Sequence, residues 1–268
     1  MTPTLQRWAQ LWRPGLVWLL VLGPFFFLSY GFANHRAAAL EAVPSIVFDW
    51  ERHIPLWPWT ILPYWSIDFF YGLSLLICRT RLELTRHALR LLTAQVLSVA
   101  AFVLFPLRFS TPRPAVEGWA GALFDALAGF DLPFNQAPSL HIVLLLILWD
   151  FYRQRLRGVW KGVLHAWSAL IGLSVLTTYQ HHFIDIPTGV LAGALCLWLW
   201  PLAGERPRWR FTREPQRLKL ASGYAMGAAL CAGAALLLGR AGWCLFWPAV
   251  SLAIVFVTAQ AGRLRALV

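Results

Sequence analysis

Long apolar runs separated by short polar segments dominate the chain. A helix needs about 20 mostly apolar residues to cross the hydrocarbon core of a bilayer. On this criterion the sequence predicts about eight membrane-spanning helices. They lie near residues 15–32, 60–78, 88–107, 139–152, 160–179, 185–202, 220–239 and 242–260. We therefore expect an all-α protein that forms a polytopic transmembrane helical bundle.

Composition agrees with this pattern, because 59% of the 268 residues are hydrophobic and only 13% are charged. Soluble domains are about half apolar and about a quarter charged. The net charge of +11 could indicate nucleic-acid binding, but the basic residues form short clusters between apolar runs. That distribution is typical of membrane-protein loops, and we expect no nucleic-acid partner. The cysteines lack CxxC spacing and indicate small buried hydrophobes instead of a disulfide framework or zinc site: Cys78, Cys196, Cys231 and Cys244.

Lys and Arg are concentrated in every second loop, and this asymmetry predicts the orientation. The rich loops lie near residues 7–13, 79–90, 153–161, 206–219 and 263–265, whereas the alternate loops hold only Arg36, Arg52, Arg108, Arg113 and Arg240. Because Lys and Arg accumulate on the cytoplasmic side, we expect both termini inside and an even number of spans. The first run is longer than a signal-peptide core of about 7–15 residues, which predicts an uncleaved first span.

The pattern divides the chain into three parts. Residues 203–219 are polar, basic and contain prolines, which predicts a cytoplasmic linker. It would join a membrane domain at 1–202, with a core at about 60–202, to a C-terminal transmembrane hairpin within 220–268. Three further features carry predictions: an amphipathic surface helix at 118–130, close helix packing at Gly158 with Gly162 and Gly189 with Gly193, and surface positions for His35, His53 and His87.

Unusual polar residues gather in three outer segments. These are 108–114 (RFSTPRP), 138–141 (PSLH) and 178–185 (TYQHHFID). The predicted topology places all three on the same face of the membrane. Ionisable groups in membrane domains are functional by default, although an interfacial polar cluster is the alternative.

Two histidines and an aspartate in these segments suit phosphoryl chemistry. A neutral imidazole can attack phosphorus, and an acceptor on its second nitrogen fixes the tautomer. His181 and Asp185 are four residues apart, so a helical turn would place them on one face. His141 could protonate the leaving oxygen and later activate water. His182, three residues before Asp185, is the alternative nucleophile.

Phosphate-binding donors are available in the same segments. Arg113 and Arg108 could hold phosphoryl oxygens, or their side chains could extend to lipid headgroups. Ser139 and the amides that open the fourth span could add further donors. Asp68, in the second span, could pair with one of the arginines or be solvated near the span's outer end.

These motifs resemble those of the type 2 phosphatidic acid phosphatase superfamily of membrane enzymes. The matches are Arg113-Pro114, the segment 138–141 and His181-x-x-x-Asp185, in the order that the superfamily has them. Leu140 stands at the usual glycine, and Val175 at the arginine six residues before the nucleophile. The second and third motifs look more like the inositol phosphorylceramide synthase and sphingomyelin synthase branch. The segment 48–74 is also similar to bacterial proteins that fuse such a membrane domain to a dual-specificity phosphatase.

The resemblance covers about 60–202 and implies a six-helix membrane core. It also implies that His181 is the nucleophile, Asp185 its orienting partner and His141 the acid. We expect an integral-membrane lipid phosphate phosphatase that forms a phosphohistidine, with no metal or other cofactor. A headgroup phosphotransferase of the same chemistry is one alternative, and a non-enzymatic lipid transporter or binder is another. The expected partners are the membrane and a lipid phosphate or phospholipid, and the expected location is a bacterial inner membrane with a periplasmic site.

Overall fold

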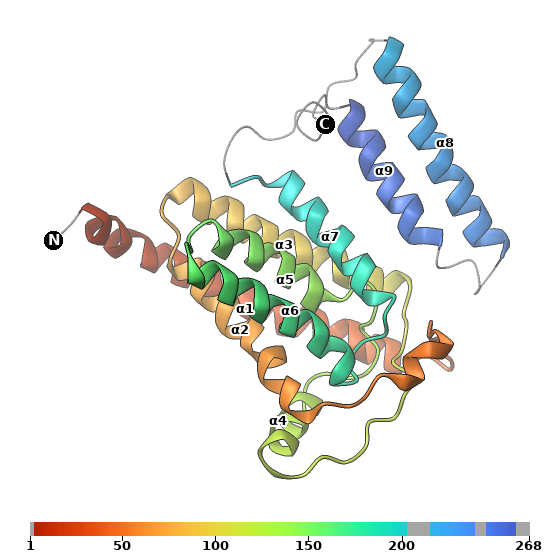
Figure 1. Cartoon of the computed structure of the whole chain (residues 1–268), viewed down its shortest axis with the longest axis horizontal. Helices are drawn as coiled ribbons and strands as arrows, with labels where there is room; N and C mark the ends of the chain where they lie inside the picture. The colour runs from red at the N-terminus through yellow and green to blue at the C-terminus, as the bar shows by residue number, and fades with distance from the viewer. Residues whose placement is uncertain (1–2, 203–214, 239–244, 261–268) are drawn as a thin grey trace. The chain divides into compact units, whose positions relative to one another are not determined.

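The computed structural model describes residues 3–202, 215–238 and 245–260. These residues form helices and no β-strand; the one isolated β-bridge joins Leu107 and Asn135. The predicted all-α class is therefore confirmed. The chain divides into two compact units, Met1–Ala203 and Gly204–Val268, and each is described by itself (Figure 1).

Within residues 3–202, the first unit contains six long helices and three short ones. The long helices are α1 (Pro3–Ala38), α2 (Ile61–Leu76), α3 (Arg81–Leu104), α5 (Leu140–Arg153), α6 (Val159–Thr177) and α7 (Asp185–Leu199). The short ones lie in the connections and are η1 (Asp49–His53), η2 (Pro58–Thr60) and α4 (Gly118–Ala128). α4 agrees with the amphipathic helix expected at 118–130, since Ala120, Gly121, Phe124 and Leu127 are its buried positions.

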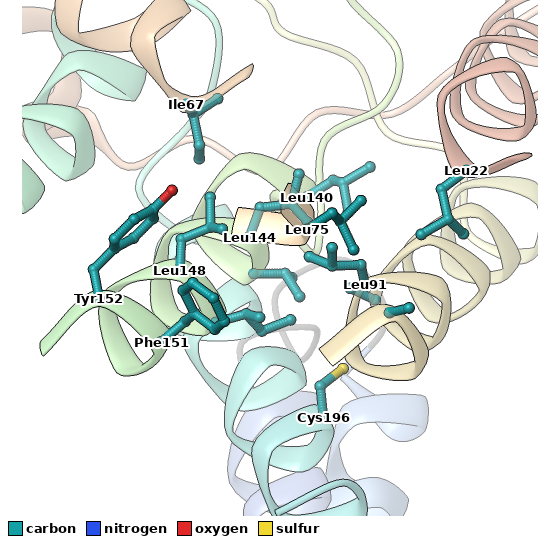
Figure 2. Close-up of a cluster of buried hydrophobic side chains, with 14 of the residues drawn as sticks. Leu22, Ile67, Leu75, Leu91, Leu140, Leu144, Leu148, Phe151, Tyr152 and Cys196 are labelled. Atoms are coloured by element: carbon teal, nitrogen blue, oxygen red, sulfur yellow. The ribbon is translucent and has the colours of Figure 1, made fainter. Parts of the chain in front are cut away.

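Helix α5 lies at the centre of this unit and contacts α2, α3, α6 and α7, while α1 packs on α2 and α3. The inward residues of α5 recur every three or four positions, as one face of a helix requires. Figure 2 shows this face, from Leu140 through Leu144 to Phe151, next to Leu75 of α2 and Leu91 of α3. This apolar core includes Leu140, the first residue of α5, and Cys196 in the second half of α7.

Small residues allow a close contact between α7 and α5. A Cβ on Gly189 would lie 2.8 Å from the carbonyl oxygen of Ser139, and one on Gly193 would lie 3.0 Å from a methyl carbon of Leu146. This confirms the expected packing role of the pair. The same expectation is wrong for Gly158 and Gly162, because nothing lies within 4 Å of an added Cβ there. Gly158 instead has φ +54° immediately before α6, a conformation that glycine adopts without strain.

Four described helices are long and apolar enough to cross a membrane: Leu11–Ala38, Arg81–Leu104, Val159–Thr177 and Leu218–Leu237. They correspond to the first, third, fifth and seventh of the expected spans. Large apolar side chains such as Val17, Leu28 and Leu237 are exposed on them, as lipid-facing positions require. The helices at the other expected spans, α2, α5, α7 and α9 (Phe246–Gln260), have 14 to 16 residues and are shorter than that criterion.

The second unit contains α8 (Pro215–Leu237) and α9, which pack against each other. The expected linker at 203–219 ends earlier than predicted, because α8 already begins at Pro215. Residues 203–214, with Arg206 and its basic neighbours, lie outside the described residues, as do Arg240, Cys244, Arg263 and Arg265. Cys78, Cys196 and Cys231 are free thiols.

One end of the first unit carries a closed polar cluster, which we define as Glu83, Arg90, Asp150, Arg153 and Arg155. Asp150 accepts from Arg90 at 2.9 Å and from Arg153 at 2.6 Å, and Glu83 pairs with Arg155 at 2.6 Å. Arg90 also donates to the carbonyl of Trp200 at the end of α7. The expected surface position of His87 is wrong, because this residue is fully buried on α3 beside the cluster and its Nε2 lies 2.7 Å from Ser74 Oγ.

Candidate functional site

At the opposite end of the first unit, the connections of the helices meet. Ser139 N donates to the carbonyl of Asp185 at 3.1 Å, so the starts of α5 and α7 are joined. Arg108 N donates to the carbonyl of Pro44 at 2.9 Å, and Gln136 Nε2 to that of Gln180 at 3.1 Å. The three polar segments that the sequence places on one face therefore lie together at one end of the bundle.

His181 and Asp185 form a hydrogen-bonded pair at the start of α7. His181 Nδ1 lies 3.0 Å from Asp185 Oδ2, and both side chains are buried. The turn before them depends on Tyr179, which has φ +56° and whose hydroxyl donates to the carbonyl of Ile54. A carboxylate at Nδ1 stabilises the tautomer with hydrogen on that nitrogen and leaves Nε2 unprotonated. This is the arrangement that an attacking imidazole needs.

His141 lies on the first turn of α5, where its ring stacks on Tyr64 with centroids 4.0 Å apart. Its Nε2 is buried and has no hydrogen-bond partner among the described residues. A buried polar atom without a partner costs free energy, so this nitrogen is available to a ligand oxygen. His141 and His181 line the same cavity, which has a volume of about 270 Å³.

The remaining walls of this cavity, which we call the histidine cavity, are mainly apolar and aromatic. They include Phe26 and Phe27 of α1, Trp65 of α2, and Phe130 after α4. Asp68 also lines the cavity, and it forms no ion pair with the predicted arginines in the described part of the chain. An apolar cavity with a few polar groups is typical of a small-molecule or lipid site.

The two predicted arginines line an adjoining cavity of about 400 Å³, which we call the arginine cavity. Arg113 is half-buried and lies over the ring of Phe124 at 4.4 Å, and burial lowers the pKa of its guanidinium. Arg108 is exposed, and neither arginine forms an ion pair within the described residues. The structure therefore does not place them in the cavity of His181. The two cavities share Leu127 and Asp131.

Ser139 is placed differently from the expectation that its hydroxyl binds phosphate. Its side chain is fully buried and caps α5, since Ser139 Oγ accepts from Ile142 N at 3.4 Å. It lines neither of the two cavities. Serine is a preferred residue at this helix position because its oxygen satisfies a free amide, and this capping accounts for the residue without a ligand.

Asp131 is a site residue that the sequence reasoning missed. It follows α4, contributes to both cavities, and accepts from Tyr30 Oη at 2.9 Å. Burial raises the pKa of Asp131, although the Tyr30 hydrogen bond and the charges of His181 and Arg113 oppose the rise. An isolated aspartate in an outer loop has no motif, and its position depends on how the loop after α4 returns to α1.

Glu51 is the second missed residue, and it is joined to His182. Glu51 Oε2 lies 2.9 Å from His182 Nδ1 and accepts from Phe183 N at 3.0 Å, while Oε1 accepts from Phe48 N at 2.9 Å. Burial favours the neutral carboxyl, but these hydrogen bonds outweigh it and lower the pKa of Glu51. Ser110 N donates to His182 Nε2 at 3.1 Å. Both ring nitrogens of the alternative nucleophile are therefore engaged.

Within the described residues, no group of three or more His, Cys, Asp and Glu side chains is arranged to hold a metal ion. No protein-family model matches the chain, and no match was found among curated proteins or solved structures.

Proposed function

We propose that the protein is an integral-membrane lipid phosphate phosphatase that works through a phosphohistidine on His181. The observation that carries this proposal is the 3.0 Å hydrogen bond between His181 Nδ1 and Asp185 Oδ2 at the wall of an apolar cavity. A histidine oriented by a buried carboxylate has the features of an activated nucleophile. The unpartnered Nε2 of His141 in the same cavity supplies a second group for proton transfer.

The proposed reaction has two steps. His181 Nε2 attacks the phosphorus and the bond to the lipid oxygen breaks, while His141 in its protonated form gives that oxygen a proton. Water then attacks the phosphohistidine, neutral His141 takes a proton from it, and inorganic phosphate leaves. Asp185 stabilises the positive charge that develops on the His181 ring. Arg113, and Arg108 beside it, bind phosphoryl oxygens that extend into the arginine cavity.

The shape and lining of the two cavities support a lipid substrate. Aromatic side chains of α1 and α2 surround the histidines, where an acyl chain would be stabilised by burial of apolar area. The adjoining cavity contains two arginines without ion-pair partners in the described structure. The histidine cavity thus suits the apolar part of a lipid phosphate and its reacting phosphorus, and the arginine cavity suits the charged phosphoryl oxygens.

A headgroup phosphotransferase is the second candidate, and the apolar lining of the histidine cavity favours it. Exclusion of water from such a site would allow a lipid or sugar hydroxyl to accept the phosphoryl-containing group in place of water. The resemblance to the inositol phosphorylceramide synthase branch of the type 2 phosphatidic acid phosphatase superfamily points the same way. A lipid transporter or binder would instead keep its function when His181 is replaced.

The membrane arrangement belongs to the same proposal. We propose that the six long helices of the first unit form the phosphatase-like core and that α8 and α9 form a C-terminal transmembrane hairpin. The basic loops would face the cytoplasm together with both termini, so the site would face the periplasm of a bacterial inner membrane. Labelling of Thr111→Cys with an impermeant maleimide on intact cells should succeed, and labelling of Arg157→Cys should require permeabilised cells.

The decisive experiment measures phosphate release from a panel of lipid phosphates by the purified protein in EDTA. Wild type should release phosphate, and His181→Ala should release none. His53→Ala is the matched control, because His53 is an exposed histidine in the η1 segment. Acid-labile, base-stable label on His181 after a short incubation with radiolabelled substrate would identify the intermediate. Full release by His181→Ala would exclude the proposed nucleophile.

If neither protein releases phosphate, the transferase is tested with labelled phospholipid donors and hydroxyl acceptors. Transfer by wild type and by His53→Ala, but not by His181→Ala, would assign the second candidate. Lack of both activities over the whole panel would contradict both enzymatic candidates.

A further inference from the structure

We infer that His182 and Glu51 are positioning residues that hold the segment between Arg108 and Arg113 against the start of α7. This inference rests on the proposed function in one respect, namely that these arginines bind a phosphoryl group. It gives a role to two residues that are not among the matched motif positions. It also gives different roles to the adjacent histidines His181 and His182.

Glu51 is the fixed point of the arrangement. Its carboxylate accepts three hydrogen bonds, from Phe48 N, Phe183 N and His182 Nδ1, at 2.9, 3.0 and 2.9 Å. The side chain is buried, so these bonds are shielded from water. The two backbone donors are Phe48, immediately before η1, and Phe183, in the turn before α7. Glu51 therefore joins the first connection to the catalytic turn independently of His182.

The partners of His182 determine which of its ring nitrogens carries the hydrogen. Ser110 N can only donate, so His182 Nε2 must accept at 3.1 Å, and the hydrogen must be on Nδ1, where it donates to Glu51. The ring also stacks on Phe109 with centroids 4.4 Å apart. Its Nε2 lone pair is used by Ser110, whereas Nδ1 of His181 faces Asp185 and leaves Nε2 for attack. His182 is therefore a connector and His181 the nucleophile.

The contact with Ser110 fixes the segment that holds the arginines. Ser110 lies two residues after Arg108 and three before Arg113, and both arginines line the arginine cavity with it. Arg108 N is also bonded to Pro44, and Phe109 N to Pro133 at 2.8 Å. The two hydrogen bonds between Glu51 and His182 and between His182 and Ser110 thus help to set the distance between the arginines and His181. Loss of the Ser110 bond would remove the one of these three contacts that ties the arginine segment to the start of α7, and would leave the pair of His181 and Asp185 intact.

The test compares two amides at position 182 that replace different nitrogens. The longer side chain of His182→Gln reaches the Nε2 position and can accept from Ser110 N. The shorter His182→Asn reaches only the Nδ1 position and can donate to Glu51. The first readout is binding of inorganic phosphate by the purified protein, which needs no turnover. We expect His182→Asn to weaken binding roughly tenfold, as the loss of one hydrogen bond predicts, and His182→Gln to restore most of it.

Further variants distinguish a positioning role of His182 from a catalytic or purely structural one. Glu51→Ala should weaken phosphate binding as His182→Asn does, whereas His53→Asn, at an exposed histidine of the same segment, should leave it unchanged. In active protein, His182→Asn should raise KM more than it lowers kcat and should still form phosphohistidine at His181. Equal weakening by Gln and Asn, or wild-type binding by both, would overturn the inference. So would label at position 182 in His181→Ala.

The outcomes for the proposed function are distinct. If wild type neither hydrolyses nor transfers, the proposed function fails, yet the graded phosphate affinities of the two amide variants would still support positioning by His182. If wild type is active and the amide variants bind phosphate as it does, only the positioning inference fails. If wild type does not bind inorganic phosphate at all, the positioning inference is overturned as well.

Discussion

The two ends of the first unit use arginines in opposite ways. In the closed polar cluster, Arg90 is only 3% exposed and is 2.9 Å from Asp150, and Arg155 is 2.6 Å from Glu83. At the other end, Arg108 and Arg113 line a cavity and form no ion pair within the described residues. Asp131 lines the same cavity, but its side chain accepts a hydrogen bond from the hydroxyl of Tyr30.

This contrast distinguishes a structural arginine from one that can bind a ligand. A buried arginine with a carboxylate partner has its charge neutralised within the fold, and removal of either partner leaves an uncompensated charge. An arginine at a cavity wall with no such partner keeps its charge for a ligand. The sequence motif and the arrangement of charges thus point to the same end of the helices.

The first prediction concerns the closed polar cluster, where a substitution should destabilise the protein most. Asp150→Ala leaves Arg90 buried without its partner, and loss of one member of a buried pair costs about 3–5 kcal/mol. We expect a large fall in the thermal midpoint of the protein in detergent micelles, with activity lost only as the fold is lost. Asp49→Ala is the control, because its pair with Arg52 is exposed and should not contribute measurably. An unchanged midpoint for Asp150→Ala would show that the cluster is not structural.

The second prediction concerns the opposite end. Arg113→Met keeps an unbranched side chain over Phe124 and removes the cation, so the midpoint should change little. Activity should fall by about 10²–10³-fold, the usual cost of removing one donor to transition-state charge. The ratio kcat/KM for a lipid phosphate measures it, with Arg108→Met beside it as the more exposed arginine. Full activity combined with a lowered midpoint would make Arg113 a structural residue and remove the contrast between the two ends.

The sequence predicts the helical class because long apolar runs leave little alternative in a membrane. It also predicts the packing of Gly189 on α5, which follows from small residues one turn apart. Helix lengths are predicted less well. Apolar residues continue beyond Leu76 and Leu199, but the helices end there, since hydropathy reports the apolar run and not its hydrogen bonding.

Within the site, short-range relations could be predicted and long-range ones could not. His181 and Asp185 are four residues apart, and helical spacing alone suggests their contact. Glu51 and His182 are 131 residues apart, and their contact depends on how the first connection folds back. At Ser139 the sequence suggests phosphate binding and the structure shows a helix cap, because the same residue types have both roles.

The third prediction tests the close contact that holds α7 beside α5. Gly189→Ala places a Cβ 2.8 Å from the Ser139 carbonyl oxygen and from Ile142 Cβ, and such overpacking costs about 1–3 kcal/mol. The shift would displace His181 and Asp185 from His141, so activity should fall with stability. Gly162→Ala is the matched control on α6, where the Cβ meets open space. It should stabilise by about 0.5–1 kcal/mol through helix propensity, and a reversed order of midpoints would contradict the contact.

The smallest expected effect concerns Asp131, the carboxyl shared by the two cavities. Burial raises the pKa of Asp131, so its proton is held more tightly in the folded state than in the unfolded state. Its stabilising contribution is therefore complete below the unfolded pKa and is lost as pH rises through the folded value. Above that value the carboxylate also repels phosphate in the cavity of Arg113, so the KM of wild type should rise with pH.

Asp131→Asn separates this effect from the titration of the histidines. An amide keeps the hydrogen bond from Tyr30 Oη and never becomes charged, so the rise of KM with pH should flatten while kcat keeps its pH dependence. The midpoint of the variant should also fall less at alkaline pH than that of wild type. Parallel KM profiles for the two proteins would mean that Asp131 does not face the bound phosphate. In that case the arginine cavity would lie farther from the reacting group than its shared wall with the histidine cavity suggests.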